Sequence, residues 1–136
     1  MPKGNTTDND ILKMTLKGTD PSWRSSGSVL YLALHIADPT ASGTQLSSEA
    51  NYSNYNRIGI TKATGWTDNG TNFTNAVLLQ FPQCGASGNT VTYVSLGIAL
   101  SGSGQILYSG QLNSPLAVAN LIQPQFSINA LTITES

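Results

Sequence analysis

Charged side chains are scarce in this chain of 136 residues. They make up 10% of the sequence, against about 25% in a typical soluble domain. The last Lys or Arg is Lys62, and no charged residue lies between Asp68 and Glu135. Soluble monomers use mixed charges for solubility and to discourage pairing of strand edges. The nearly uncharged second half of the sequence therefore favours a surface that lies against another protein. The alternative is an ordinary β-domain with few charges.

Three further absences limit the class of protein. The net charge of -1 provides no electrostatic footprint for nucleic acid or anionic lipid. No run reaches the roughly 18 apolar residues of a membrane span, and residues 1–4 lead into polar sequence without the apolar core of a signal peptide. We expect a protein made and kept in a cytosol, with no nucleic-acid and no membrane partner.

Cysteine and histidine occur once each. The single Cys84 excludes an internal disulfide, and there is no Cys/His cluster for zinc. His35 has neither partner ligands nor a marked nucleophile to activate, so we interpret it as a core or interface imidazole. Cys84 has no neighbouring cation and is interpreted as a structural thiol. No metal and no cofactor is expected.

The carboxylates give no sign of an active site. Helix capping and turns explain most of them, which leaves Asp38 and Glu49 beside a long polar stretch. A glycosidase pair would need one acid in an apolar pocket and a second at a set distance, and nothing in the sequence marks such a pair. We expect no catalytic residues and no enzymatic activity.

The longest apolar run spans residues 28–37, between the turn formers Ser26-Gly27 and Asp38-Pro39. Both alternate sets of side chains are apolar, which predicts a central strand that is covered on both faces. Helix is the competing interpretation, because Leu and Ala are good helix formers. The bounding Gly and Pro favour the strand.

Residues 1–27 are predicted to form an N-terminal arm with a short helix, before a β-sandwich domain of residues 28–136. Thr7 is the predicted N-cap, with Asp10 in the capping-box position and Gly18 as the C-terminal stop. A helix this short is unstable alone and must dock its apolar face on the fold or on a neighbour. That face consists of Ile11, Leu12 and Leu16.

The rest of the chain alternates in short segments spaced by turn signals. Asn69-Gly70 is a hairpin signal between strand-like residues. Seven or eight such segments predict an all-β fold, an antiparallel β-sandwich that is jelly-roll-like or immunoglobulin-like. The expected strands cover residues 56–62, 66–73 as a hairpin, 75–81, 90–100, 105–112, 115–119 and 123–134, with Phe126, Ile128, Leu131 and Ile133 in the core and a bulge at Asn129-Ala130.

Residues 38–54 form a long polar loop, and loops of this length are uncommon unless they bind something. Tyr52, Tyr55 and Arg57 follow it and are the best interface candidates, since aromatic residues and Arg dominate interface energetics. Together with Trp23 and the helix face they are the predicted partner contacts. Aromatic residues are able to line a sugar-binding face, but more often they lie in a core or an interface; those concerned are Tyr31, Tyr52, Tyr55, Trp66, Tyr93 and Tyr108.

Several motifs carry a resemblance to a known family. They are Leu30-Tyr31-Leu32-Ala33-Leu34-His35-Ile36-Ala37-Asp38-Pro39-Thr40, Tyr52-x-x-Tyr55-x-Arg57, Trp66, Asn75-Ala76, Phe81-Pro82, Leu107-Tyr108-Ser109-Gly110-Gln111-Leu112 and Ala130-Leu131-Thr132-Ile133-Thr134. This pattern resembles small virion proteins of tailed bacteriophages, described as tail-fibre-like or structural. It is also similar to the β-sandwich cement proteins that decorate phage capsids. The resemblance covers Val29 to Glu135 and names no catalytic residue.

The resemblance implies a virion structural protein that is assembled in the host cytoplasm. The expected function is that of a capsid cement or decoration protein on the capsid surface, bound as a homo-oligomer, dimer or trimer, across junctions of the major capsid protein. The alternative is a tail-associated or tail-fibre protein that recognises host-surface glycan. A fibre usually has an elongated shaft with repeats, and no repeat is found here, which favours the cement role.

Overall fold

Strand β1 (Val29–His35) is an interior strand of a four-stranded antiparallel sheet with the order β2-β1-β6-β7. The longest apolar run therefore forms the predicted central strand and not a helix. Strand β7 lies at the edge, next to β6. The other strands of this sheet are β2 (Ile58–Thr61), β6 (Thr90–Gly97) and β7 (Ile106–Ala117).

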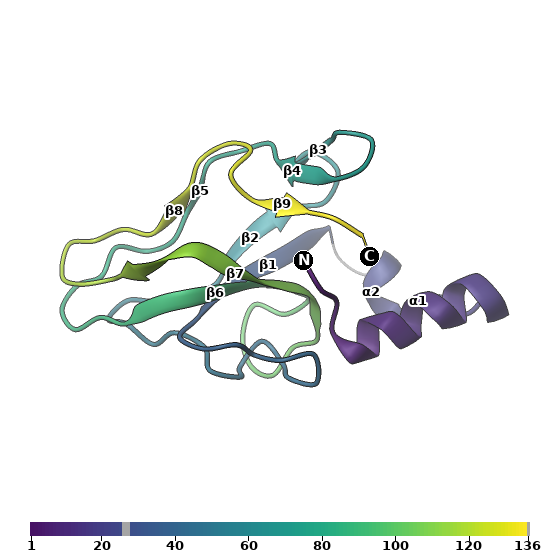
Figure 1. Ribbon diagram of the computed structural model, residues 1–136, viewed down its shortest axis with the longest axis horizontal. Coiled ribbons are helices and arrows are strands. Elements are labelled where there is room, and N and C mark those ends of the chain that lie inside the picture. Colours follow the sequence, from purple (N-terminus) through teal and green to yellow (C-terminus); the bar gives the residue numbers. More distant parts are fainter. Residues whose placement is uncertain (26–27, 136) are drawn as a thin grey trace.

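The structure is a computed structural model that describes residues 1–25 and 28–135. Ser26 and Gly27, the predicted turn before β1, lie outside the described residues. Helix α1 (Asn5–Lys17) and the short helix α2 (Ser22–Ser25) precede the strands, and α1 projects to one side of the sandwich (Figure 1). The division at residue 27 into an arm and a domain stays a prediction.

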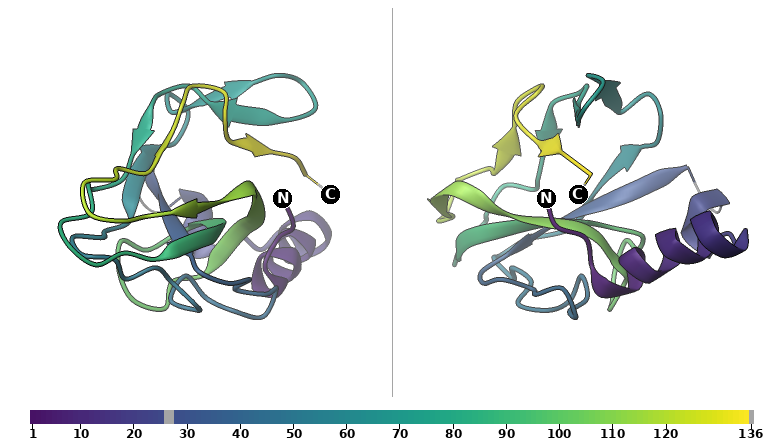
Figure 2. Two further views of the ribbon diagram at one scale, coloured as in Figure 1. Left: turned by 60° about the vertical axis from the view of Figure 1, so that its left-hand side comes forward. Right: turned by 45° about the vertical axis from the view of Figure 1, so that its right-hand side comes forward.

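The second layer of the sandwich consists of two short antiparallel ladders (Figure 2). In one, β4 (Phe73–Asn75) pairs with β3 (Trp66–Asp68) and with β9 (Thr132–Ile133). In the other, β5 (Leu79–Gln80) pairs with β8 (Gln125–Phe126). The predicted antiparallel β-sandwich with an N-terminal helix is confirmed. This layer is smaller than the second four-stranded sheet of a regular eight-stranded jelly roll.

The core lies between the two layers. Leu32 pairs with Leu96 across β1 and β6, and Leu34 pairs with Val94, so these side chains share the inner face. All four are buried, and each contributes about 1.5–3 kcal/mol by leaving water. Buried residues that pack in the same cluster include Tyr52, Ile60, Leu79, Phe81, Cys84 and Leu131.

The outer face of β1 is covered by the loop of residues 38–54. Gln45 in this loop is fully buried, and its Oε1 accepts a hydrogen bond from Ala99 N at 3.0 Å. Gln45 lies so close to Gly97 that a Cβ there would be 2.2 Å from its side chain, so only glycine fits. Strand β1 is thus covered on both faces as predicted, but one cover is a loop.

Helix α1 begins earlier than the sequence predicts. Its N-cap is Gly4, and Thr7, the predicted N-cap, lies within the helix and is buried. Thr7 Oγ1 donates a hydrogen bond to Ile106 O at 2.8 Å, so the hydroxyl fastens α1 to β7 and does not cap it. Asp10 accepts from Trp23 Nε1 at 2.9 Å and has no capping role. The stop at Gly18 is confirmed, because Gly18 has the left-handed φ of 67°.

The predicted strand over residues 75–81 is wrong, since the chain bends between β4 and β5. The buried Asn75 causes the bend. Its Nδ2 donates to Val77 O at 2.8 Å and to Ser127 O at 2.9 Å, and its Oδ1 accepts from Leu131 N at 2.9 Å. One amide side chain thus holds segments from β4, β5 and the C-terminal region together.

Two further boundaries differ from the prediction. Residues 115–117 are not the start of a separate strand but the end of β7, where Pro115 is tolerated because β7 is an edge strand. Asn129 has a φ of 67° and lies in a turn, not in a bulge. This turn leaves Ile128 exposed and outside the core, in contrast to the prediction.

Candidate interaction surface

Arg57 and Glu49 form a bidentate ion pair at the end of the loop of residues 38–54. Arg57 Nε and Nη2 donate to the two Glu49 oxygens at 2.6 and 2.8 Å. Nη1 donates to Ala99 O at 3.1 Å and Nη2 to Gly102 O at 2.6 Å. Arg57 is 5% exposed, and the hydrogen bonds to Glu49 raise its pKa. The pair joins the loop to the segment after β6.

The two tyrosines beside this pair also have partners within the chain. Tyr55 OH donates to Glu49 Oε2 at 2.7 Å and accepts from Leu34 N at 3.2 Å. Burial, and then the hydrogen bond to Glu49, raise the pKa of Tyr55 far above its usual range. Tyr52 OH donates to Pro82 O at 2.6 Å, and burial raises the pKa of Tyr52 to about 12. Both rings therefore anchor the loop to the sandwich.

The single histidine and the single cysteine are enclosed. His35 Nδ1 lies 2.8 Å from Ser47 O, and Nε2 lies 2.7 Å from Ser95 Oγ. Burial lowers the pKa of His35 below its ordinary 6.5. The thiol of Cys84 is buried and donates to Ser87 O at 3.4 Å. As interpreted, His35 is a core imidazole with partners for both ring nitrogens, and the Cys84 thiol is held within the fold.

A polar hollow lies beside the Arg57–Glu49 pair. Its volume is about 360 Å³, and Leu100 and Gly102 form part of its wall. The side chains exposed around it are mostly amides. The residues that give this polar hollow its character are Asn51, Asn54, Tyr55 and Asn56.

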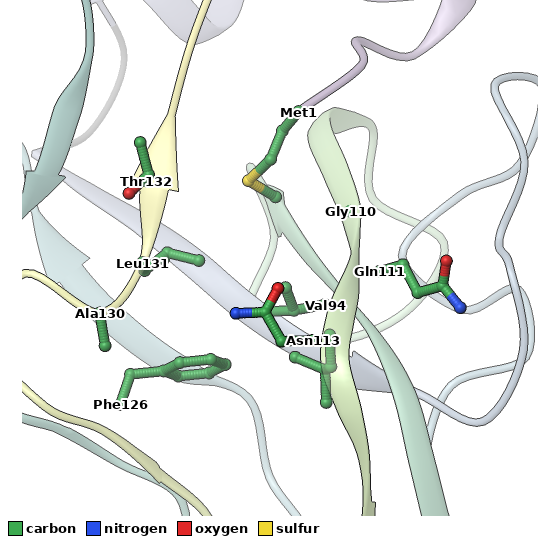
Figure 3. Close-up of a pocket in the computed structure, with 10 residues that line it drawn as sticks. Met1, Val94, Gly110, Gln111, Asn113, Phe126, Ala130, Leu131 and Thr132 are labelled. Carbon is green, nitrogen blue, oxygen red and sulfur yellow. The ribbon is translucent and has the colours of Figure 1, made fainter.

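The sandwich is not closed along β7. Between β7 and the C-terminal segment lies a cavity of about 240 Å³, with Val94 and Gly110 on one side and Leu131 and Thr132 on the other. Figure 3 shows the Met1 side chain pointing into this gap. The N-terminal residues also pair with β7, since Ser109 N donates to Pro2 O at 2.9 Å.

Next to this cavity, apolar side chains from both layers are open to solvent in a continuous groove. Two adjoining hollows of about 220 and 270 Å³ share Leu96 and Tyr108 as their floor. Almost no polar surface lines either hollow, and the Phe73 side chain at the edge is 45% exposed. We call this the mouth groove; it is formed by Trp23, Leu30, Trp66, Phe73, Tyr108 and Ile133.

Both ends of the chain are fixed at the mouth groove. Tyr108 OH donates to Glu135 Oε2 at 2.6 Å, and burial raises the pKa of Tyr108 above its usual range. Lys3 binds the same carboxylate and also lies 3.5 Å from Asp8 of α1. The two termini accordingly lie side by side in Figures 1 and 2. The C-terminal segment at the edge of the groove is therefore held in place by these contacts.

Charged residues of opposite sign lie on the two sides of the mouth groove. Arg24 and Lys62 line it on the side of α2, where Lys62 Nζ donates to Trp23 O at 2.8 Å. On the side of the β3–β4 hairpin, Asp68 is paired across the strands with Phe73. Glu135 follows Ile133 at the same side. An apolar centre with a charged rim is the usual composition of a protein interface.

Helix α1 presents a second apolar surface. Leu12 is 56% exposed and Leu16 is 75% exposed, one helical turn apart on the outward face. Ile11 is half-buried, and Thr7 is the buried residue of the helix. The predicted docking face is therefore divided, because Ile11 turns toward the body of the fold and the two leucines turn away from it.

The predicted interface residues fall into two groups. Ile11, Leu12, Leu16 and Trp23 lie on the two helices, and Trp23 is part of the mouth groove. Tyr52, Tyr55 and Arg57 lie in the buried network beside the polar hollow. That any of them contacts a partner stays a prediction.

The sequence did not predict which residues come together to form the mouth groove. Phe73 and Tyr108 belong to different layers, and their alternation in two strands gives no sign that they meet at one opening. In the sequence, Trp66 and Tyr108 share only the property of being aromatic residues that are able to line a sugar-binding face. The position of Phe73 shortly after the hairpin signal Asn69-Gly70 is a local sign that its ring is not fully enclosed, and in the structure the ring is 45% exposed.

Over residues 1–25 and 28–135, no three His, Cys, Asp or Glu side chains come together as metal ligands. In the same part of the chain no helix has the length and apolar character needed to cross a membrane.

Comparison with known protein families assigns the chain to a family. The search of curated proteins found nothing similar. A family model described as podophage GP4 fiber I protein gp80 matches residues 2–134, which is nearly the whole chain. The predicted resemblance to phage virion structural proteins is thereby confirmed at that level, and its fibre branch is supported more than its cement branch. The chain belongs to this family of podophage fibre proteins and is a phage virion structural protein.

Proposed function

We propose that this protein is a component of a bacteriophage tail fibre and takes part in recognition of the host surface. The observation that carries the proposal is the match of residues 2–134 to the podophage fibre I family. This reverses the order of the two functions expected from the sequence, where capsid cement came first. The missing shaft and repeats had favoured cement, but a small globular unit is also able to serve as one module of a fibre.

A fibre module needs one surface for the virion and another for the host, and the fold offers two such surfaces. The mouth groove is apolar, aromatic and charged at its rim, which suits contact with another virion protein. The lining of the polar hollow includes the paired Arg57 and Glu49, three asparagine residues and the half-buried ring of Tyr55. The two surfaces share no residue, so a virion protein and a host ligand can be bound at the same time.

The polar hollow suits a glycan. Each Asn side chain offers two N–H donors and a carbonyl acceptor, and sugar hydroxyls both donate and accept. Asn54 and Asn56 are exposed at the hollow, and the ring of Tyr55 lies beside them. The bidentate pair of Arg57 with Glu49 fixes the wall from below. A rigid polar site of this kind orients a ligand through a few well-placed groups.

The proposed role is binding without catalysis. His35 and Glu49 are the side chains best suited to acid–base chemistry, and both are engaged within the fold. Both His35 ring nitrogens lie against oxygen atoms of the chain. Glu49 is paired with Arg57 and Tyr55. We accordingly propose that the protein needs no cofactor.

Antibody labelling of intact virions tests the location. Gold-labelled antibody against the purified chain is expected at the tail, and a stained gel of purified particles is expected to show few copies per virion. Label spread over the head, with many copies per particle, would contradict the fibre role and support capsid cement. The neutral half of the sequence between Asp68 and Glu135 is the observation that keeps cement as the second candidate.

Binding of fluorescently labelled protein to host cells tests recognition of the surface. Wild-type protein is expected to bind and Asn56→Ala to bind less, because the variant removes donors and an acceptor at the polar hollow. Asn120→Ala, at an exposed position between β7 and β8 that does not line the polar hollow, is the matched control and is expected to bind as the wild type does. Equal binding by Asn56→Ala and wild type would exclude the hollow as the contact.

A further inference from the structure

We infer that the outward face of α1 in one copy of the chain docks into the mouth groove of a second copy. The occupant is thus a helix of this same protein, and the contact is head-to-tail. The inference goes beyond the proposed recognition of the host, because it concerns how copies join. It does not use the polar hollow.

The mouth groove is the open end of the sandwich interior. Leu96 on its floor belongs to the inner face of β6, and Trp66 and Phe73 come from the opposite layer. Leu96 itself is buried, but the rings of Trp66 and Phe73, which would be core in a closed sandwich, stay partly open to water here. An apolar, concave surface with two Trp, one Phe and one Tyr is the kind that binds the apolar face of a helix.

The outward face of α1 matches this groove in chemistry. Leu12 and Leu16 are one turn apart and largely exposed, which is the i, i+4 spacing of anchor residues in helix-in-groove contacts. Within a single copy more than half of the Leu12 surface and three quarters of the Leu16 surface stay open to solvent. An open apolar groove and a largely exposed apolar ridge are complementary when a second copy is present.

A copy is unable to fill its own groove. Thr7 Oγ1 holds α1 to Ile106, and Asp10 binds both Trp23 Nε1 and Gln105 Nε2. These contacts fix the helix by the face opposite to Leu16. The outward leucines therefore point away from the body of their own chain, and Figure 1 shows α1 projecting from it.

The charges beside the two surfaces are arranged in the same complementary way. Asp8 precedes Leu12 by one turn, is half-exposed and lies 3.5 Å from Lys3 of its own chain, and Lys17 follows Leu16 at the other end of α1. The groove carries Lys62 and Arg24 on one side, where Arg24 forms an exposed pair with Asp20, and Asp68 on the other. A docked helix with its acidic first turn toward the cations places its basic last turn toward the acidic side. Such pairing sets orientation more than affinity.

Measurement of mass in solution tests the inference. Light scattering on a dilution series of the full chain is expected to show an oligomer that dissociates at least about tenfold more readily in Leu16→Gln and in Phe73→Ser, as for loss of one anchor residue. Leu121→Gln is the matched control, since Leu121 is 70% exposed but lies in the loop before β8. It is expected to behave as the wild type.

Mixing the two variants identifies the occupant. Leu16→Gln keeps an intact groove, and Phe73→Ser keeps an intact helix face, so their mixture is expected to form one native contact and to associate where each variant alone does not. A wild-type chain that stays monomeric overturns the inference. So does a Leu16→Gln variant that associates as tightly as the wild type, or a mixture that associates no better than either variant alone. Binding to host cells is measured separately and does not depend on any of these three outcomes. The inference can therefore fail while the proposed function stands.

Discussion

The buried network around Arg57 and the mouth groove are built on opposite principles. In the network, Arg57, Glu49 and Tyr55 satisfy one another and the ends of nearby loops. In the groove, large apolar rings such as Phe73 stay open to water. Completed polar contacts stabilise the fold, because unpaired buried groups are costly. Incomplete apolar contacts add little to the fold and are available to a partner. The predictions below test this contrast.

The largest effect is expected at Arg57. Arg57→Met leaves the Glu49 carboxylate without its bidentate partner and frees the carbonyl groups of Ala99 and Gly102. Loss of one member of a buried ion pair costs about 3 to 5 kcal/mol, to be measured by urea unfolding. Arg24→Gln is the control, because its pair with Asp20 is exposed and is expected to contribute at most about 1 kcal/mol. Equal losses for both variants would contradict the contrast.

A second large effect is expected at Asn75, which is the polar anchor of the smaller layer. Asn75→Ala removes three hydrogen bonds inside the fold and leaves Leu131 N without its acceptor. We expect a loss of about 2–4 kcal/mol, since each unsatisfied buried group costs about 1–3 kcal/mol. Thermal unfolding followed by circular dichroism measures it. Asn9→Ala on α1 serves as control, and an unfolding temperature of Asn75→Ala close to that of this control would be evidence against the anchor role.

A smaller effect is expected from acid. Burial lowers the pKa of His35 below 6.5, so the folded protein holds the ring neutral while the unfolded chain takes up a proton. The free energy of unfolding therefore falls as the pH drops below 6.5, through the range between the unfolded and folded pKa values. Urea unfolding at a series of pH values measures this slope. His35→Gln is expected to flatten it, and an unchanged slope in the variant would assign the effect to another group.

The smallest effects on stability are expected at the exposed apolar side chains. Leu16→Gln and Phe73→Ser are expected to change the free energy of unfolding by less than about 1 kcal/mol, as is usual for surface positions. Measured at protein concentrations where the chain is monomeric, this result separates folding from association. A loss as large as that of Arg57→Met would mean that these side chains support the fold, and the two regions would no longer differ.

Local pattern predicted the strands well and the polar partnerships poorly. The alternation around Leu32, the hairpin at Asn69-Gly70 and the stop at Gly18 depend on neighbouring residues only. Thr7 was predicted to be a cap because its sequence neighbours suit a cap. The hydroxyl instead binds Ile106, which is distant in the chain, and no local pattern contains that contact.

Errors in the later strands have a similar origin. The apolar run of residues 76–79 favours a strand, but Asn75 has more hydrogen-bond partners across the fold than a ladder would give it. These long-range contacts prevailed over the local preference for a strand. That Tyr52 and Tyr55 contact a partner stays a prediction; within the chain their hydroxyl groups donate to Pro82 O and Glu49 Oε2.

The sequence by itself determined the all-β class, the central strand β1 and the scarcity of charge, because side-chain alternation and turn residues act over a few positions. The tertiary structure alone decided that the sandwich stays open along β7 and that Trp66, Phe73 and Tyr108 meet at that opening. It also decided that the helix leucines face outward. Both depend on how distant strands are ordered, and strand order is set by the packing of the whole chain.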